Sequence, residues 1–598
     1  MILSRHDSVG PSGWRKDSSQ LANNFGYSSA EASFSLRFSA FLCVSAFIFI
    51  SRLFNFDQQP DKAGSNRANR STDTEMQARR VWSGRVDQCR VDLRPLPPIV
   101  SNMLAKGRLS SAKSSCRAGS RMLVALTLFC GLAVLVPGAE VSVPSWPQFR
   151  GPNCSGVAAH ATPPVKIGPT NCVLWCMDLP WSPSSPCIWG ERIFVTTFSE
   201  GQLQTRCYDR HTGMLRWSSG LKPEQLEAFN QTENNPAAPT PATDGRHVVS
   251  YFGSFGLICH DPEGRELWRH RLPVAMSGCG FGSGTSPIIE GQLVILDRDQ
   301  DQNSSLLAVD VATGKTAWET PRPDATGSFG TPIIWNHDDA DDVVVPGCLR
   351  LKGYDVKTGK ERWRAEGVAA FTCPTPVVGD GWLYFAAWSP GKADAPWPSW
   401  DSSLEKLDKN KDGIVGLDEL PESDRNAMTA IDVDHDGKIT KAEWDIFMAR
   451  NAKARNVMVA LKPGGRGDIT QTHVAWEFTR GLPYVASPLF YQGRVYTVKD
   501  GGMLSSLDAK TGKPYYLQER LEASGNYYAS PVAADGRIYL ASLAGKVTVV
   551  KAGGDQPEIL HQADFGDRIL ATPALVGDAL YLRTQKKLYA LGDKPVAQ

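Results

Sequence analysis

The phrase DVATGKTAW at residues 310–318 decides the fold, because it returns with small changes along the chain. Related phrases are DRHTGMLRW at 209–217, DVKTGKERW at 355–363, DAKTGKPYY at 508–516 and the shorter DPEGRELW at 261–268. Asp can accept hydrogen bonds from turn amides, Gly allows the positive φ of a tight turn, and Trp offers a large apolar face. Each phrase predicts a strand, a tight turn and a new strand, and five copies indicate a repeat architecture.

A second phrase, Ser or Thr followed by Pro and an apolar strand, sets the period of the repeat. It is clear in TSPIIEGQLVIL at 285–296 and ASPVAADGRIYLA at 529–541. Its prolines stand at positions 186, 241, 287, 332, 376, 488, 531 and 573. Six of the seven steps are 42 to 55 residues, close to the length of a four-stranded propeller blade (about 40–50), and the step from 376 to 488 is longer by about one module. The sequence therefore predicts an all-β, eight-bladed β-propeller with an insertion in its fifth unit.

The charge of the chain is unevenly distributed. The whole sequence has 64 Lys and Arg and 63 Asp and Glu, a net charge of +1. Residues 1–121 hold 18 basic and 9 acidic residues, so the remainder has 46 and 54 and a net charge of −8. An acidic body disfavours nucleic acid as a partner.

The N-terminal region has the layout of a secretory signal placed deep in the chain. Residues 1–121 show no sustained periodicity and are expected to be a disordered or wrongly assigned extension. Arg121, an apolar run at 122–136 and Pro-Gly-Ala at 137–139 then predict a signal peptide at 122–139. We expect a periplasmic or secreted protein whose mature chain begins near Glu140 and has no stable membrane span. An uncleaved anchor with a cytoplasmic arm is the alternative, which N-terminal sequencing of the exported protein decides.

The ring of blades needs one more strand to close. The last unit, at 571–592, lacks a final Trp-containing strand, and CVLWCMD at 172–178 has the apolar character to supply it. We expect residues 172–178 to complete the last blade, which removes open sheet edges. The propeller then spans residues 146–598.

The repeats resemble those of the pyrroloquinoline-quinone (PQQ)-like propellers, a family of quinoprotein dehydrogenases and the non-enzymatic assembly factor BamB. The family phrase A-x-D-x-x-T-G-x-x-x-W is matched by Ala308, Asp310, Thr313, Gly314 and Trp318. The resemblance implies the fold, but fold does not fix activity. Dehydrogenases of this family carry two adjacent cysteines over the quinone, and this sequence has no Cys-Cys pair. Bound PQQ and catalytic residues are therefore not expected.

Two loops in the insertion carry the pattern D-x-[DN]-x-[DN]-G-x5-E of EF-hands. Loop one is DKNKDGIVGLDE at 408–419 and loop two is DVDHDGKITKAE at 432–443. In this pattern oxygen ligands surround Ca²⁺ and the Gly allows a sharp bend. The expected ligands are Asp408, Asn410, Asp412, Ile414 and Glu419 in loop one and Asp432, Asp434, Asp436, Lys438, Thr440 and Glu443 in loop two. The alternative, a metal-free acidic surface loop, is disfavoured by two complete matches so close together.

The spacing of the loops limits what the EF-hand pair, at 400–450, can do. The loops start 24 residues apart and Pro421 interrupts the segment between them, which leaves room for one short helix near 423–431. We expect a structural clip rather than a sensor that opens widely. Val415 and Ile439 are expected to pair the two loops. Loop two offers four carboxylates against three, so we expect it to bind Ca²⁺ more tightly.

The insertion should share one face of the propeller with the links between blades, because successive strands alternate in direction. These links include the Gly-rich GCGFGSG at 278–284 and the helix-like PEQLEAFN at 223–230. This face is the expected binding site. The acidic DRDQDQN at 297–303 lacks the Gly and final Glu of a calcium loop, so we expect a solvated hairpin loop, with a metal site as the alternative.

These patterns predict a secreted or periplasmic, non-catalytic propeller that binds calcium and serves as a scaffold for an envelope protein or a glycan. A PQQ-dependent oxidoreductase is the alternative, which a bound chromophore and dye reduction would reveal. In a third possibility the propeller is purely structural and the EF-hand pair only stiffens one loop. Pull-down with and without a chelator separates this possibility from a binding protein.

Overall fold

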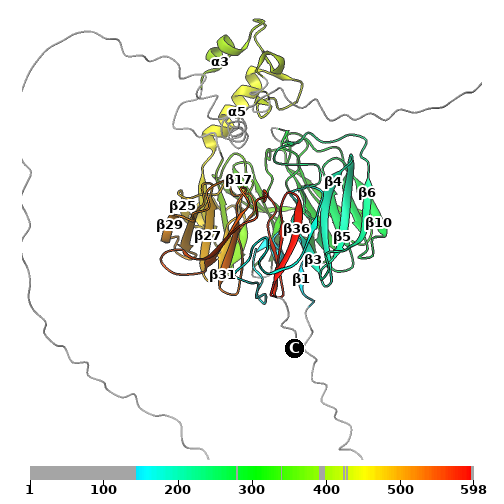
Figure 1. Cartoon of the computed structure of the whole chain (residues 1–598). Coiled ribbons are helices and arrows are strands. Elements are labelled where there is room, and N and C mark those ends of the chain that lie inside the picture. The colour runs from blue at the N-terminus through cyan, green and yellow to red at the C-terminus, as the bar shows by residue number, and fades with distance from the viewer. Residues whose placement is uncertain are drawn as a thin grey trace, which may run out of the picture. The chain divides into compact units, whose positions relative to one another are not determined.

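The computed structural model describes residues 143–277, 280–337, 340–389, 398–421, 425 and 428–593. Eight sheets of four or five strands are arranged radially as the blades of a β-propeller, which confirms the predicted fold (Figure 1). The expected extension at 1–121 and signal peptide at 122–139 lie outside the described residues. Within the described part of the chain, no helix is long and apolar enough to cross a membrane.

Blades one to four are antiparallel meanders of consecutive strands. Their strands are β3 (Cys187–Trp189), β4 (Arg192–Ser199), β5 (Gln202–Asp209) and β6 (Leu215–Leu221); β7 (Ala242–Thr243), β8 (Val248–Phe252), β9 (Gly256–His260) and β10 (Glu266–Arg271); β11 (Ile288–Glu290), β12 (Leu293–Arg298), β13 (Ser305–Asp310) and β14 (Thr316–Pro321); and β15 (Ile333–His337), β16 (Ala340–Gly347), β17 (Arg350–Asp355) and β18 (Glu361–Glu366). Two short strands extend the sheets of blades one and four. The strand β1 (Ser145–Trp146) pairs with β3, and β24 (Gly467–Asp468) pairs in parallel with β18.

Blades five to seven repeat the pattern, and blade eight supplies three strands of its own. These strands are β19 (Val377–Gly379), β20 (Trp382–Ala387), β23 (Val457–Leu461) and β25 (Val474–Phe478); β26 (Leu489–Tyr491), β27 (Arg494–Lys499), β28 (Met503–Asp508) and β29 (Pro514–Arg520); β30 (Val532–Ala534), β31 (Arg537–Ala541), β32 (Lys546–Lys551) and β33 (Glu558–Asp564); and β34 (Ala574–Val576), β35 (Ala579–Arg583) and β36 (Lys587–Gly592). A single helical turn, α6 (Thr470–His473), precedes β25.

The ring closes with a strand from the other end of the propeller. The strand β2 (Val173–Asp178) pairs antiparallel with β36, from Val173 opposite Leu591 to Asp178 opposite Lys587. The predicted closing strand is therefore confirmed. Because β2 and β36 lie far apart in the sequence, their pairing holds the first and last blades together without an open edge.

The repeated Ser/Thr-Pro phrase forms a closed ring of hydrogen bonds around the axis. In each blade the backbone N–H of the Ser or Thr donates to the hydroxyl of the equivalent residue in the next blade, at 2.9 to 3.1 Å. The ring residues are Ser185, Thr240, Ser286, Thr331, Thr375, Ser487, Ser530 and Thr572. Each hydroxyl satisfies a buried N–H that no strand partner reaches, which explains why the phrase recurs.

A Trp in the outer strand of a blade joins that blade to the next one at five junctions. The Trp268 Nε1 donates to the Val311 carbonyl at 2.8 Å, and a Cβ added at Gly314, whose φ is +68°, would lie 2.6 Å from the Trp268 ring. Gly is required there by both the turn and the close approach. The same packing recurs in the pairs Trp175 and Gly213, Trp217 and Gly264, Trp318 and Gly359, and Trp476 and Gly512.

Residues 143–158, here called the plug, lie across one end of the central channel. Within the plug, Asn153 exchanges two hydrogen bonds with Ile334 of blade four, at 2.7 and 2.8 Å. The Arg150 guanidinium donates to the Pro488 carbonyl of blade six at 2.8 Å. Val157 pairs with Ala533 of blade seven. These partners all follow a ring residue by one to three positions, so the plug lies on one side of the ring.

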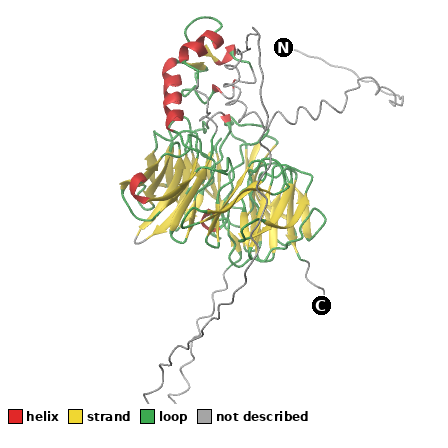
Figure 2. Cartoon of the chain, turned by 90° about the vertical axis from the view of Figure 1, so that its left-hand side faces the viewer, coloured by secondary structure: helices red, strands yellow, loops and turns green. Residues whose placement is uncertain are grey.

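The insertion leaves blade five between β20 and β23. It contains α3 (Trp400–Leu407), the single turn η3 (Leu417–Glu419), α5 (Lys441–Lys453) and the two-stranded sheet of β21 (Val415–Gly416) and β22 (Lys438–Ile439). Figures 1 and 2 show its helices on one face of the propeller. Of the short helix predicted near 423–431, residues 423, 424, 426 and 427 lie outside the described residues; Arg425 and Met428 are helical, and 429–431 form a turn.

Candidate functional site

The two calcium-type loops face each other through the short sheet of β21 and β22. Val415 pairs with Ile439 and both side chains are buried, as the sequence predicted for position eight of each loop. Gly413 and Gly437 have φ values of +86° and +81°, so the position-six glycines make the expected bends.

Loop two brings three of its expected ligands together. Asp432, Asp434 and Asp436 each present an oxygen, and these oxygens lie within 4.8 Å of one another. Asp432 is 1% exposed, burial raises its pKa, and its Oδ1 has no hydrogen-bond partner among the described residues. A buried oxygen without a partner costs free energy unless a donor or a cation satisfies it.

The other expected ligands of loop two are held by the backbone. Glu443 accepts hydrogen bonds from the Val433 N–H at 3.0 Å and the Thr440 N–H at 2.9 Å. The Thr440 hydroxyl donates to the Glu443 carboxylate at 2.8 Å and caps α5. Lys438, expected to offer its carbonyl, lies in β22 and donates its N–H to Asp436 at 2.8 Å.

Loop one has the same turn geometry with fewer close carboxylates. The Gly413 N–H donates to Asp408 at 2.9 Å, the Asp412 N–H to Asn410 at 2.8 Å, and the Ile414 N–H to Asp412 at 2.9 Å. Glu419 accepts from Gly416 at 2.7 Å, and hydrogen bonds from the Gly416 and Asn410 N–H groups lower its pKa. Both loops present the hard oxygens that Ca²⁺ prefers, and loop two also holds the buried oxygen without a partner.

Loop two and α5 contact the propeller directly. The His435 Nε2 lies 2.9 Å from the Asp301 carboxylate, which raises the His435 pKa, and Gln302 donates to the Val433 carbonyl at 3.2 Å. In α5, Arg450 donates to the Thr326 hydroxyl at 3.0 Å, and its guanidinium lies 4.7 Å from the centre of the Phe371 ring. Loop two is therefore attached to blade three, and α5 to the links on either side of blade four.

An axial pocket of about 1220 Å³ lies beside loop two and is lined by all eight ring residues. A second layer of lining, here called the collar, consists of the residues two positions before each ring residue. The collar is Pro183, Ala238, Gly284, Phe329, Cys373, Val485, Tyr528 and Leu570. Because the plug contacts residues that follow the ring, collar and plug lie on opposite sides of it. Thr429 and His435 of the insertion also line the pocket.

The pocket joins segments that the sequence placed on one face. Residues of the links at 225–234 and 280–284 line it together with the insertion. The sequence interpretation missed the ring and the collar, although the Ser/Thr-Pro phrase marks both by position. The helix-like interpretation of 223–230 was wrong, since this link forms no helix. The backbone of this link makes hydrogen bonds outside the link: the Glu227 N–H donates to the Ser254 hydroxyl at 3.0 Å.

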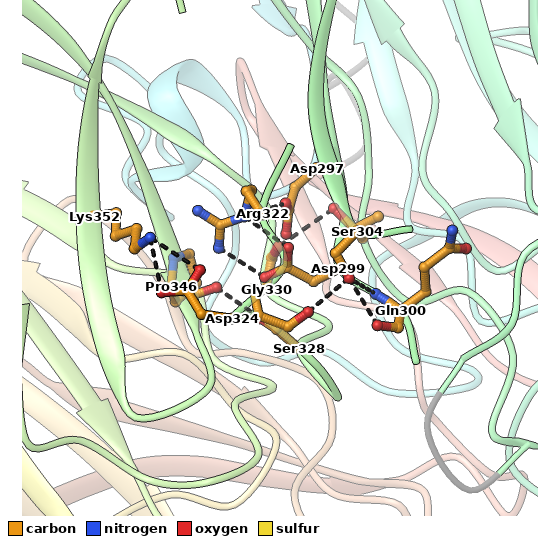
Figure 3. Close-up of polar contacts among 12 residues, drawn as sticks. Asp297, Asp299, Gln300, Ser304, Arg322, Asp324, Ser328, Gly330, Pro346 and Lys352 are labelled. Atoms are coloured by element: carbon orange, nitrogen blue, oxygen red, sulfur yellow. Dashed lines mark hydrogen bonds and ion pairs between the residues drawn. The ribbon is translucent and has the colours of Figure 1, made fainter. Parts of the chain in front are cut away.

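A buried network next to the pocket corrects the interpretation of DRDQDQN as a solvated loop (Figure 3). Asp297 is fully buried and Asp299 is 8% exposed. The Arg322 guanidinium, itself 1% exposed, donates to both Asp299 oxygens at 2.7 Å and also contacts Asp297 and the Tyr354 hydroxyl. Burial raises the pKa of Asp297 well above its usual range. These carboxylates neutralise an internal guanidinium and do not face solvent.

The repeats, the closed ring and the Trp contacts define a propeller of the PQQ-like class. A profile of the family described as "Outer membrane protein assembly factor BamB" matches residues 172–386 and 454–593, more than half of the chain. The chain belongs to this family. The gap in the match covers the insertion, where an EF-hand profile matches residues 426–448. Among curated proteins, none matches the sequence.

The chain is similar to several solved structures. BamB from Moraxella catarrhalis is 14% identical, with a TM-score of 0.46 over 70% of this chain and 99% of that one. Quinohemoprotein alcohol dehydrogenase from Comamonas testosteroni is 11% identical, with a TM-score of 0.46 over 75% and 81%. A europium-containing methanol dehydrogenase is 12% identical, with a TM-score of 0.45 over 75% and 98%. Likenesses at this level carry no argument about function.

Proposed function

We propose that this protein is a non-catalytic, calcium-binding propeller scaffold that binds an envelope protein or a glycan on the face carrying the insertion. One observation carries the proposal: His435, inside calcium loop two, lines the axial pocket and bonds Asp301 of the propeller. Ca²⁺ held by the expected ligands of loop two would fix the position of His435. Calcium binding and partner binding are thereby linked at one surface.

The chemistry of the pocket supports the proposed non-catalytic scaffold over the alternative function, a PQQ-dependent oxidoreductase. PQQ carries three carboxylates, which need cationic or metal partners when they leave water. The ionisable carboxylates that line the pocket are Glu227 and Glu233, and no lining residue within the described part of the chain is Lys or Arg. This lining does not fit a tricarboxylate. The sequence also has no Cys-Cys pair.

The proposal includes export. The mature chain would begin near Glu140, after a signal peptide at 122–139, and would comprise the propeller at 146–598 with the EF-hand pair at 400–450. The layout of a basic residue, an apolar run and a small residue at the cleavage point supports this processing. Outside the cytoplasm even weak calcium sites, with Kd of about 10⁻⁴ to 10⁻³ M, would be filled.

Calcium-dependent capture from envelope extract tests the scaffold function. We expect the mature protein to retain a partner in about 1 mM Ca²⁺, a concentration that fills weak extracellular sites, and to release it into a chelator. Replacement of His435 by Ala should weaken capture. Replacement of Lys357 by Ala, on the D-x-x-T-G turn of the opposite face, should not. Equal capture with and without Ca²⁺ would contradict the proposal, and dye reduction after addition of PQQ would favour the oxidoreductase.

The two loops are expected to differ in calcium affinity. Loss of a group that merely supports a metal ligand typically costs 10- to 100-fold, so loss of a direct carboxylate ligand should cost at least about tenfold. Asp432→Ala should remove the tighter binding event in calorimetry, because loop two has more carboxylates and holds the buried Asp432 oxygen. Asp408→Ala should remove the weaker event. Equal losses would refute the ranking.

A further inference from the structure

Five phenylalanines contribute to the wall of the axial pocket. Phe149 of the plug and four link residues, Phe229, Phe281, Phe329 and Phe371, all line the same cavity of about 1220 Å³. Such a cavity is large enough to enclose a drug-sized molecule. Aromatic faces are electron-rich and attract apolar bodies or organic cations, whereas an anion is disfavoured over the ring face.

The wall of the pocket carries acidic side chains. Glu227 and Glu233 line the pocket, whereas no described lining residue is Lys or Arg. His435 also lines it, but this imidazole faces the Asp301 carboxylate at 2.9 Å. Glu233 accepts a hydrogen bond from the Tyr528 hydroxyl at 3.0 Å, which fixes its carboxylate beside the collar.

Glu227 keeps one carboxylate oxygen without a partner. Glu227 is only 2% exposed. Its Oε2 accepts hydrogen bonds from the Ser283 N–H at 2.9 Å and from the Ser283 hydroxyl at 2.7 Å. Its Oε1 has no hydrogen-bond partner among the described residues. A Cβ at Gly253 would lie 2.3 Å from Oε2 and 2.5 Å from Oε1, so the backbone of blade two holds this carboxyl in place.

The burial of Glu227 makes its ionisation sensitive to a bound charge. Burial raises its pKa to about 7, against the hydrogen bonds from Ser283 that lower it. Arg298, the nearby cation, donates to the Pro273 carbonyl and does not line the pocket. A cation placed beside Oε1 would favour the ionised form and satisfy the free oxygen.

We propose that the axial pocket binds an organic cation, an amine with an apolar body, whose ammonium pairs with Glu227 and whose body contacts the surrounding Phe rings. This inference goes beyond the proposed scaffold function and does not depend on it, because the pocket chemistry is independent of any macromolecule on the outer face. A neutral ligand or an anionic one is the competing outcome.

Three compounds with one phenylbutyl body test the charge preference. We expect 4-phenylbutylammonium to bind the mature full chain, in the presence of Ca²⁺, with a stoichiometry of one in calorimetry. The neutral 4-phenylbutanol should bind roughly tenfold more weakly, the usual effect of losing one charge-assisted hydrogen bond. The anionic 4-phenylbutyrate should bind more weakly still. Tighter or equal binding of the alcohol or the acid, or no binding of the amine, would overturn the proposal.

Matched variants locate the site. Glu227→Gln should weaken 4-phenylbutylammonium roughly tenfold and leave 4-phenylbutanol unchanged, because only the charged hydrogen bond is lost. Glu224→Gln, in the same link with a side chain 86% exposed, removes the same charge and should change neither affinity. If Glu227→Gln does not fold, Glu233→Gln replaces it with the same expected direction. An ammonium affinity unchanged in the pocket variants would overturn the proposal, whatever the scaffold experiment gives.

Discussion

Deletion of residues 146–180 will abolish folding of the propeller, at a cost of more than about 5 kcal/mol, the lower end of typical domain stability. The deletion removes β2, which completes blade eight by pairing with β36. It also removes the plug, whose Trp146, Arg150 and Cys154 are fully buried. Both losses leave unpaired backbone groups and empty volume in the centre of the ring, which neighbouring side chains cannot fill.

Excision of the insertion is the matched control, because it removes more residues than the deletion of 146–180 but leaves the ring of blades intact. Ala387 and Val457 pair directly at its base, and Ser389 and Asn456 exchange hydrogen bonds at 2.9 and 3.0 Å. Replacement of residues 390–455 by an Asn-Gly turn therefore leaves an ordinary hairpin. Urea unfolding followed by circular dichroism should show a cooperative transition for the variant without the insertion and no cooperative transition for the variant without residues 146–180. A cooperative transition at parental stability after deletion of 146–180 would disprove closure by β2.

Arg322→Met will destabilise the protein by about 3–5 kcal/mol, because removing one member of a buried ion pair leaves its partner charged in the interior. Arg322 is 1% exposed and donates two hydrogen bonds to Asp299, which is itself buried. Met preserves much of the side-chain volume, so the loss is mainly electrostatic. The measurement is the urea midpoint at constant m-value at neutral pH.

Two further variants separate this effect from general loss of a cation. Arg350→Met breaks an ion pair with Asp324, which is 33% exposed, and should cost less than about 1 kcal/mol. Arg322→Met combined with Asp299→Asn should recover part of the stability, because the unpaired carboxylate is removed with its partner. Equal costs for the two single variants would show that Arg322 is not the counter-ion of this network.

Periodic features of the sequence were sufficient to predict the fold. The phrase at 310–318 and its copies recur because each supplies an Asp for the turn, a Gly for the left-handed backbone and an aromatic residue for packing. The closing strand was also predictable, since the last unit lacked one strand and residues 172–178 had the pattern to supply it. The EF-hand region was also predictable, because oxygen ligands for Ca²⁺ recur at fixed positions within twelve residues.

The sequence could not predict contacts between residues that are distant in the chain. It gave no sign that Asp297 and Asp299 are buried, because the pairing cation, Arg322, follows more than twenty residues later. The link at 223–230 has a helical pattern, yet the Ser254 hydroxyl accepts a hydrogen bond from the Glu227 N–H and Ser283 of the neighbouring link donates to the Glu227 carboxylate. Local propensity is a weak prior that such tertiary bonds override.

By itself the sequence determined the number of blades, the strand that closes them and the two acidic loops, since each of these depends on short-range spacing. Only the tertiary structure decided that the eight Ser/Thr hydroxyls form one ring, that the residues two positions earlier form the collar, and that His435 meets Asp301 beside the pocket. Closing a ring brings equivalent positions of every repeat to one axis, and side chains that are unremarkable one at a time become a single binding surface there.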